Sequence, residues 1–165
     1  MTRTVKAGAV ALIALGALSP MPAQADTRDL APTCDNICVL DARAGAHVDF
    51  DRVVFDLTGG QPLIQAAESN SGSYGLPSGE TSTLQISGKS YLFLDLQGAD
   101  AFDVSGNRTY ANPDVQSIDL SSIKGVQRIP DAEGQVHFGL TLGDHSKCNV
   151  STLTAPDRIV VDVYH

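Results

Sequence analysis

Short segments in which apolar and polar residues alternate recur along most of this chain, and they limit its fold more than any other feature. The pattern is clearest at residues 135–142 (QVHFGLTL), where every second residue from Val136 to Leu142 is apolar. A period of two places successive side chains on opposite faces of a β-strand. Short strands of this kind, separated by turns, predict an all-β fold: a small β-sandwich of about seven to eight mostly antiparallel strands.

The remaining expected strands are separated by turns rich in Gly, Ser and Asn. They are residues 50–57, 82–87, 91–97, 126–129, 148–153 and 158–164. We expect at most one short helical turn, at residues 117–124, where three apolar residues are followed by Gly125. The polar stretch at residues 69–83 predicts an exposed, mobile loop, which is a candidate for part of a binding surface.

The amino-terminal residues have the three parts of a secretory signal. A basic start is followed by an apolar run at residues 7–18 and by the small-residue motif AQA at residues 23–25. We therefore expect a signal peptide over residues 1–25, cleavage near Ala25, and a secreted protein that is extracellular or associated with the cell wall. The apolar run is shorter than the roughly twenty residues that cross a bilayer, so no membrane insertion is expected.

The chain is acidic, with 19 Asp and Glu residues against 11 Lys and Arg and a formal net charge of −8. This balance argues against nucleic acid as a partner, because nucleic acid is bound by basic patches. A neutral, zwitterionic or cationic partner is easier to accommodate.

Three cysteines, Cys34, Cys38 and Cys148, would enter an oxidising compartment, where one disulfide and one free thiol are expected. All three pairings are open. We slightly favour a long bridge to Cys148, because residues 26–46 predict an extended segment with at most one short strand and little apolar surface. The folded domain is expected at residues 47–165.

No cofactor and no metal site are expected. The Cys34-x3-Cys38 motif has no matched second pair of ligands, and the four histidines are scattered along the chain.

Two segments at opposite ends of the expected domain are alike: DRVVFDL at residues 51–57 and DRIVVDV at residues 157–163. Alternation directs Val53, Phe55 and Leu57 of the first segment, and the equivalent residues of the second, to the core. We hypothesise that the two strands pair antiparallel with Val54 opposite Val160. This register gives two structural ion pairs, Arg52 with Asp162 and Asp56 with Arg158.

The alternative is that the two strands lie in different sheets and that each charge serves a local neighbour. A catalytic role for the paired carboxylates is disfavoured, because an arginine beside each Asp stabilises its ionised form, whereas acid–base catalysis needs one raised pKa.

The order and spacing of several motifs resemble the AMIN-like domain of secreted bacterial proteins. These motifs are FDRVVFDL, Arg108-Thr109-Tyr110, the DAEG turn at residues 131–134 before VHFGLTL, and the final PDRIVVDV. The resemblance covers residues 47–165 and implies a β-sandwich with a role in binding the cell envelope, above all peptidoglycan. Two residues depart from the family pattern: Ala132 replaces a Phe, and Cys148 replaces an aromatic residue.

No enzyme is expected, because the chain has no G-x-S-x-G motif or other marked nucleophile with its base. Sugar-binding surfaces present exposed aromatic rings, and the chain has no Trp but four Tyr. Tyr74 in the polar stretch, and Tyr110 with Arg108 in the family-like segment, are the candidate ligand-binding residues. The alternative for Tyr110 is that it packs on the sandwich with its hydroxyl bonded to the backbone.

The sequence therefore predicts a secreted, non-catalytic protein that binds the cell envelope, with a cell-wall glycan or an envelope protein as its partner. The alternative is an extracellular protein-interaction domain with an inhibitory or assembly role, which the acidic charge and the scarcity of stacking aromatic residues favour. The oligomeric state is left open.

Overall fold

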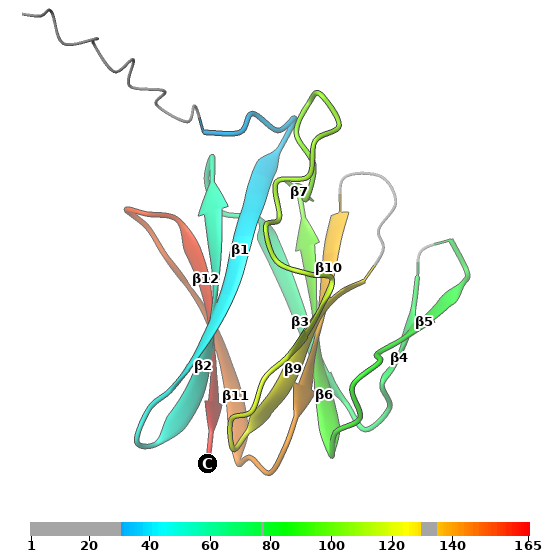
Figure 1. The fold of residues 1–165 in the computed structure, drawn as a ribbon, viewed down its shortest axis with the longest axis vertical. Coiled ribbons are helices and arrows are strands. Elements are labelled where there is room, and N and C mark those ends of the chain that lie inside the picture. Colours follow the sequence, from blue (N-terminus) through cyan, green and yellow to red (C-terminus); the bar gives the residue numbers. More distant parts are fainter. Residues whose placement is uncertain (1–30, 77, 130–134) are drawn as a thin grey trace, which may run out of the picture. The chain divides into compact units, whose positions relative to one another are not determined.

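The computed structural model describes residues 31–76, 78–129 and 135–165, which form a β-sandwich of two five-stranded sheets (Figure 1). The predicted all-β fold is confirmed, although the structure has twelve strands where about seven to eight were expected. Among the described residues there is no helix that is long and apolar enough to span a membrane. The expected signal peptide, its cleavage site and the DAEG turn lie outside the described residues.

The first sheet, sheet A, contains both of the similar segments noted in the sequence. Its strands lie in the order β11 (Lys147–Leu153), β12 (Arg158–Tyr164), β2 (Phe50–Thr58), β1 (Ile37–Ala46) and β7 (Ala99–Asp100). Neighbouring strands are antiparallel except for β1 and β7, which are parallel.

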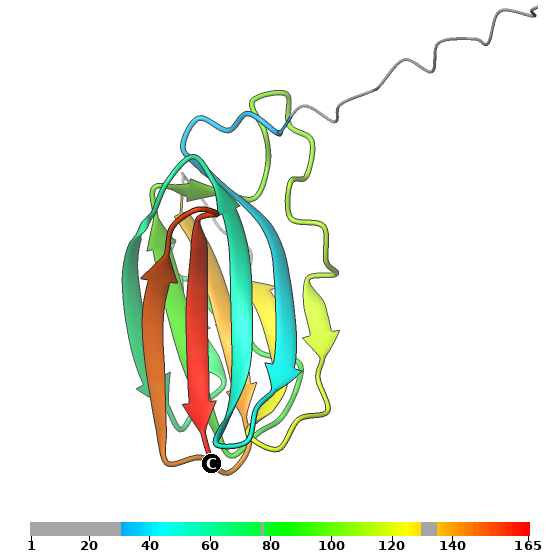
Figure 2. The same ribbon diagram turned by 90° about the vertical axis from the view of Figure 1, so that its left-hand side faces the viewer.

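The second sheet, sheet B, faces sheet A and is antiparallel throughout. Its strands lie in the order β3 (Leu63–Ser69), β6 (Ser90–Gln97), β10 (Gln135–Leu142), β9 (Ile123–Ile129) and β8 (Val115–Ser117). Figure 2 shows β11 of sheet A and β3 of sheet B on the same side of the sandwich, where each strand is the edge of its sheet.

The core lies between the two sheets and is built from the inward faces of the alternating strands. Val53 and Phe55 of β2, and Val161 of β12, are fully buried, as their alternation predicts. The ring of Phe55 lies 4.6 Å from that of Phe138 on β10, which joins the centres of the two sheets. Burial of such large apolar side chains is the main favourable contribution to folding.

Strands β2 and β12 pair in the register inferred from the sequence, with Val54 opposite Val160. The Arg52 guanidinium donates two hydrogen bonds to the Asp162 carboxylate, at 2.6 and 2.9 Å. These hydrogen bonds raise the pKa of Arg52.

The second expected ion pair, Asp56 with Arg158, does not form, although the two residues are backbone partners. Asp56 instead accepts two hydrogen bonds from Arg43 on β1, at 2.8 and 2.7 Å. Arg158 turns back to the carbonyl of Pro156. The reason is that β1 lies on the other side of β2 and offers Asp56 a competing arginine, which the sequence analysis did not place there.

The segment at residues 26–46, which was expected to be extended with at most one short strand, contributes a long strand to sheet A. Its described part contains the ten-residue strand β1, which pairs with β2 along nearly its whole length, so the sandwich begins before His47. Val39 and Ala42 of β1 are buried in the core.

The expected long disulfide to Cys148 is wrong, because Cys34 is bonded to Cys38 and Cys148 is a free thiol. Since β1 already holds the amino-terminal segment to sheet A through backbone pairing, the segment does not depend on a distant covalent bond.

The expected helical turn at residues 117–124 is also wrong. Ser117 ends β8 and Ile123 begins β9, with an irregular turn between them. Ile118 and Leu120 pack against the core from this turn, so their two-residue spacing reflects extended backbone.

The polar stretch at residues 69–83 contains a hairpin where a loop was expected. Its strands are β4 (Ser73–Gly75) and β5 (Thr81–Thr83), and β5 is also shorter than the strand expected at residues 82–87. Leu84 follows the hairpin and is buried over Gly139 of β10, where a Cβ atom would lie 2.5 Å from the Leu84 side chain. The missing side chain at Gly139 thus lets the hairpin pack on the outer face of sheet B.

We expect Arg52→Ala to lower the free energy of unfolding by about 2–3 kcal/mol, because it leaves the buried Asp162 carboxylate without its charged partner. The Asp162 side chain is only 8% exposed. Urea unfolding of the variant and the wild type measures the loss.

Arg43→Ala is the matched control, since it removes another bidentate pair in which the arginine is 53% exposed and Asp56 is 27% exposed. This control should cost less than about 1 kcal/mol. Equal losses in the two variants would contradict the importance given to the Arg52–Asp162 pair.

Candidate functional site

One end of the sandwich gathers the β5–β6, β8–β9 and β10–β11 connections, at the lower end of the molecule in Figure 1. They line an open cleft of about 650 Å³, and a neighbouring hollow of about 450 Å³ shares Ser121 and Asp144 with it. We call the two together the end cleft. Its polar lining includes Ser87, Lys89, Asp119, Ser121, Asp144 and His165.

The end cleft presents charges of both signs. The Lys89 ammonium lies 2.5 Å from the Asp144 carboxylate, and both side chains are largely exposed to solvent. Lys124 lines the same cleft, and its ammonium donates to the carbonyl of Leu120. An exposed ion pair contributes little to stability, so these groups can exchange their partner for a charged ligand at small cost.

A serine, a histidine and an aspartate also meet at this end. Ser121 Oγ lies 2.9 Å from His165 Nε2, and Asp51 Oδ1 lies 3.5 Å from the same nitrogen. In a catalytic triad the acid holds Nδ1 while Nε2 faces the hydroxyl, which this arrangement does not reproduce. Asp51 also accepts a hydrogen bond from the buried backbone N–H of Ser122 at 2.7 Å. The group therefore holds the end of β12 to the turn between β8 and β9.

A row of aromatic side chains runs along the outer face of sheet A at the same end. The rings of His47 and Phe50 are stacked with centroids 4.5 Å apart, and those of Phe50 and Tyr164 are 5.4 Å apart. We call these three residues the aromatic row. Arg52 lies over the Phe50 ring, and Lys147 lies over the Tyr164 ring.

No motif along the chain marks the aromatic row, although the register of β2 with β12 contains part of it. With Val54 opposite Val160, Phe50 must lie opposite Tyr164 on the same face. His47 lies in the turn between β1 and β2. Its position could not be predicted, because the sequence did not identify β1 and therefore did not show the length of this turn.

Tyr110 and Arg108, two of the predicted ligand-binding residues, make contacts within the domain. Tyr110 is fully buried, and burial raises the pKa of its hydroxyl, which accepts a hydrogen bond from Gln116 at 2.7 Å. The alternative that Tyr110 packs in the sandwich is therefore correct, with a side-chain partner in place of the backbone. Arg108 donates to the Tyr110 carbonyl at 2.6 Å and to the Asp114 carboxylate at 2.8 Å.

Tyr74, the third predicted residue, lies half-buried on β4 and faces sheet B. Its hydroxyl donates to Asp95 at 2.5 Å and lies 3.1 Å from His137 Nδ1. Burial, followed by the hydrogen bond to Asp95, raises the pKa of the Tyr74 hydroxyl. These contacts fasten the hairpin to sheet B, and no contact within the described residues joins Tyr74 to Tyr110 or Arg108.

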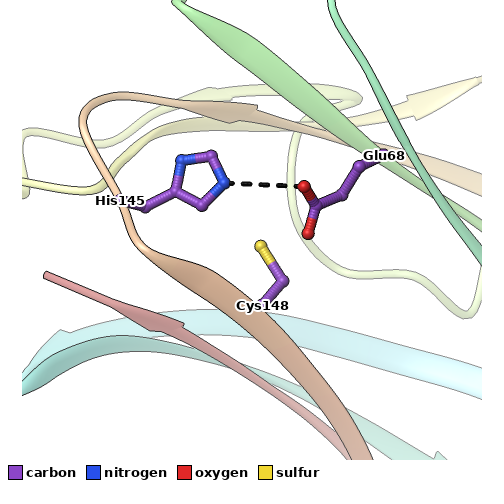
Figure 3. A group of neighbouring side chains, drawn as sticks. All are labelled: Glu68, His145 and Cys148. Atoms are coloured by element: carbon purple, nitrogen blue, oxygen red, sulfur yellow. Dashed lines mark ion pairs between the residues drawn. The ribbon is translucent and has the colours of Figure 1, made fainter.

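A histidine, a cysteine and a glutamate converge where β3 and β11 approach each other (Figure 3). His145 Nε2 lies 3.7 Å from Glu68 Oε2, and the three donor atoms of Glu68, His145 and Cys148 all lie within 4.8 Å of one another. Burial, followed by the Glu68 carboxylate, raises the pKa of the Cys148 thiol to about 12. No spacing motif marks this group in the sequence, because Glu68 is distant in the chain from the other two residues.

A β-sandwich with a polar cleft and an aromatic row at one end has the form of a binding domain. The model of the AMIN-like domain family matches residues 38–165, and the chain belongs to this family. Membership indicates, at the level of the family, a cell-wall-associated binding role and an extracellular or envelope location. Comparisons with curated proteins and with solved structures gave no significant match.

We expect Cys148 to react slowly with iodoacetamide at pH 8 in a chelating buffer, because the thiolate is the reactive form and the thiol is mostly protonated below a pKa of about 12. Glu68→Gln should speed the reaction about threefold or more, since it removes a charge that opposes the thiolate. Mass spectrometry measures the rate and should also find Cys34 linked to Cys38.

Glu80→Gln changes an exposed glutamate outside this group and should leave the rate unchanged. Alkylation of native Cys148 as fast as in the unfolded chain would contradict the proposed protonation state.

Proposed function

We propose that this protein is an exported, non-catalytic cell-wall-binding protein whose ligand is peptidoglycan. The binding surface in this proposal is the aromatic row together with the adjoining end cleft. The family-level role and the signal-like amino-terminal sequence support it, since both agree with a partner in the cell envelope.

The aromatic row carries the proposal. Sugar rings have apolar C–H faces that stack on aromatic side chains, and such contacts occur where rings are accessible at a protein surface. His47 is exposed, and Phe50 and Tyr164 are partly so. Neighbouring centroids are 4.5 and 5.4 Å apart, so the three rings form one cluster. In this proposal Arg52 and Lys147, which lie over the Phe50 and Tyr164 rings, move aside when sugars stack there.

The end cleft supplies the polar contacts that the peptide stems of peptidoglycan require. Stem peptides carry carboxylates and free amino groups, and the cleft offers Lys89 and Lys124 to the first and Asp119 and Asp144 to the second. Local pairs of this kind allow binding by a chain whose net charge of −8 does not favour an anionic partner.

Two observations support a role without catalysis. His165 meets both Ser121 and Asp51 through Nε2, so the acid does not orient the imidazole as a general base for the serine. The thiol of Cys148 lies beside a carboxylate and has a raised pKa, which is the reverse of what an activated cysteine needs.

Sedimentation with purified, protein-free sacculi tests the proposal. We expect the wild-type protein to be retained and the double variant Phe50→Ala/Tyr164→Ala to bind about tenfold more weakly, because two ring contacts are each worth roughly 0.5–1.5 kcal/mol. Phe102→Ala is the control, since Phe102 is 43% exposed and is not part of the row.

Absence of wild-type retention, or equal retention of the double variant, would contradict the peptidoglycan proposal. Binding to whole envelopes but not to protein-free sacculi would favour the alternative of a protein-interaction domain. Release of soluble fragments from the sacculi would contradict the non-catalytic role.

A further inference from the structure

The open side of the sandwich between β3 and β11 holds three potential metal ligands. Glu68 comes from β3 at the edge of sheet B, Cys148 from β11 at the edge of sheet A, and His145 from the turn that leads into β11. Figure 3 shows the three side chains directed toward a common point from these separate elements.

The three donors are a carboxylate oxygen, an imidazole nitrogen and a thiol sulfur, a combination that suits zinc. Zinc bonds of roughly 2.0–2.3 Å place tetrahedral ligands about 3.3–3.8 Å apart. The oxygen of Glu68 and Nε2 of His145 are already 3.7 Å apart, and no pair of donors exceeds 4.8 Å. The Glu68 side chain is 50% exposed, which leaves it free to adjust toward a shared ion.

His145 is oriented as a metal ligand would be. Its Nδ1 lies 3.3 Å from the carbonyl oxygen of Gly143, which can only accept, so Nδ1 carries the hydrogen. Nε2, which faces Glu68, is then the ring nitrogen that is left to bind a metal ion. A backbone carbonyl that holds the second ring nitrogen is the usual support of zinc-binding histidines. The His145 side chain is 13% exposed, which limits its freedom to turn away.

Cys148 is available for this role because Cys34 and Cys38 are bonded to each other. Its side chain is partly buried against the core, which restricts the positions that the sulfur can take. Of the three residues, His145 also lines the end cleft, whereas Cys148 and Glu68 do not.

We propose that Glu68, His145 and Cys148 form a zinc site that joins the edge strands of the two sheets, with water as the fourth ligand. On binding, the Cys148 thiol gives its proton to solvent and the sulfur forms a bond to the metal. The site follows from these three side chains alone and does not rest on the proposed function.

Titration of the chelator-treated protein, with the Cys34–Cys38 disulfide intact, with Zn²⁺ in a calorimeter tests the proposal, with Co²⁺ as a spectroscopic substitute. We expect one ion per chain, a sulfur-to-cobalt charge-transfer band, and a rise of about 4 °C or more in Tm with saturating zinc. Cys148→Ser should remove the charge-transfer band, and it should weaken zinc binding about 100-fold, as should Glu68→Gln.

Glu80→Gln is the matched control for Glu68→Gln and should bind zinc as the wild type does. Circular dichroism of each variant without metal separates loss of binding from loss of folding. Because Glu68 is exposed, we expect Glu68→Gln to fold, so it still tests the site if Cys148→Ser does not fold. Failure of the wild type to bind stoichiometric zinc, or unchanged affinity in Glu68→Gln and Cys148→Ser, would overturn the proposal. Retention on sacculi is a separate readout.

Discussion

The antiparallel pairing of β2 with β12 joins the two ends of the domain, and both sheet A and the candidate site depend on it. Arg52 and Asp162 are 110 residues apart in sequence, yet they form a bidentate pair with the carboxylate almost wholly buried. The same ladder sets Phe50 beside Tyr164 in the aromatic row. It also brings Asp51 to the end of β12, where its carboxylate holds the turn at Ser122. The pairing of β2 with β12 therefore both closes sheet A and brings together residues of the proposed binding surface.

Much of this arrangement could be predicted from alternation alone. Strands such as β2, β10 and β12 are buried on the inward face, so their pattern is strong and their register follows from two matching segments. The edge strand β3 is harder to identify, because its side chains are mostly exposed and Ile64 is its one residue that packs against the core. Strand β1 contains a bulge between Val39 and Asp41, which interrupts the alternation that would have identified it.

The sites were harder to predict than the strands, for a physical reason. Residue type alone does not show that Tyr110 is buried, or that Arg108 donates to the Tyr110 carbonyl. The group of Glu68, His145 and Cys148 forms because edge strands of two different sheets lie close together. The spacing of these residues in the sequence does not indicate that they are neighbours. The histidines described as scattered in sequence include one that the fold brings to a thiol and a carboxylate.

The two proposals place peptidoglycan binding and zinc binding at neighbouring parts of the sandwich. The aromatic row and the end cleft present ring faces and exposed charges, which suit a large, flexible polymer. The metal ligands lie where the sandwich is open between edge strands, and an ion there would join the sheets at a place where no backbone ladder does. Zinc would therefore stiffen the side of the domain that adjoins the turn at His145, which also lines the end cleft.

The central claim is that the binding surface lies at the end of the sandwich that carries the aromatic row. Amide chemical-shift mapping with a soluble peptidoglycan fragment tests it most directly. The account predicts that the perturbed amides cluster at residues 47–50, 118–122, 143–146 and 164–165, with those at residues 101–108 unchanged. Perturbations concentrated at residues 101–108, or none at saturating fragment, would contradict it.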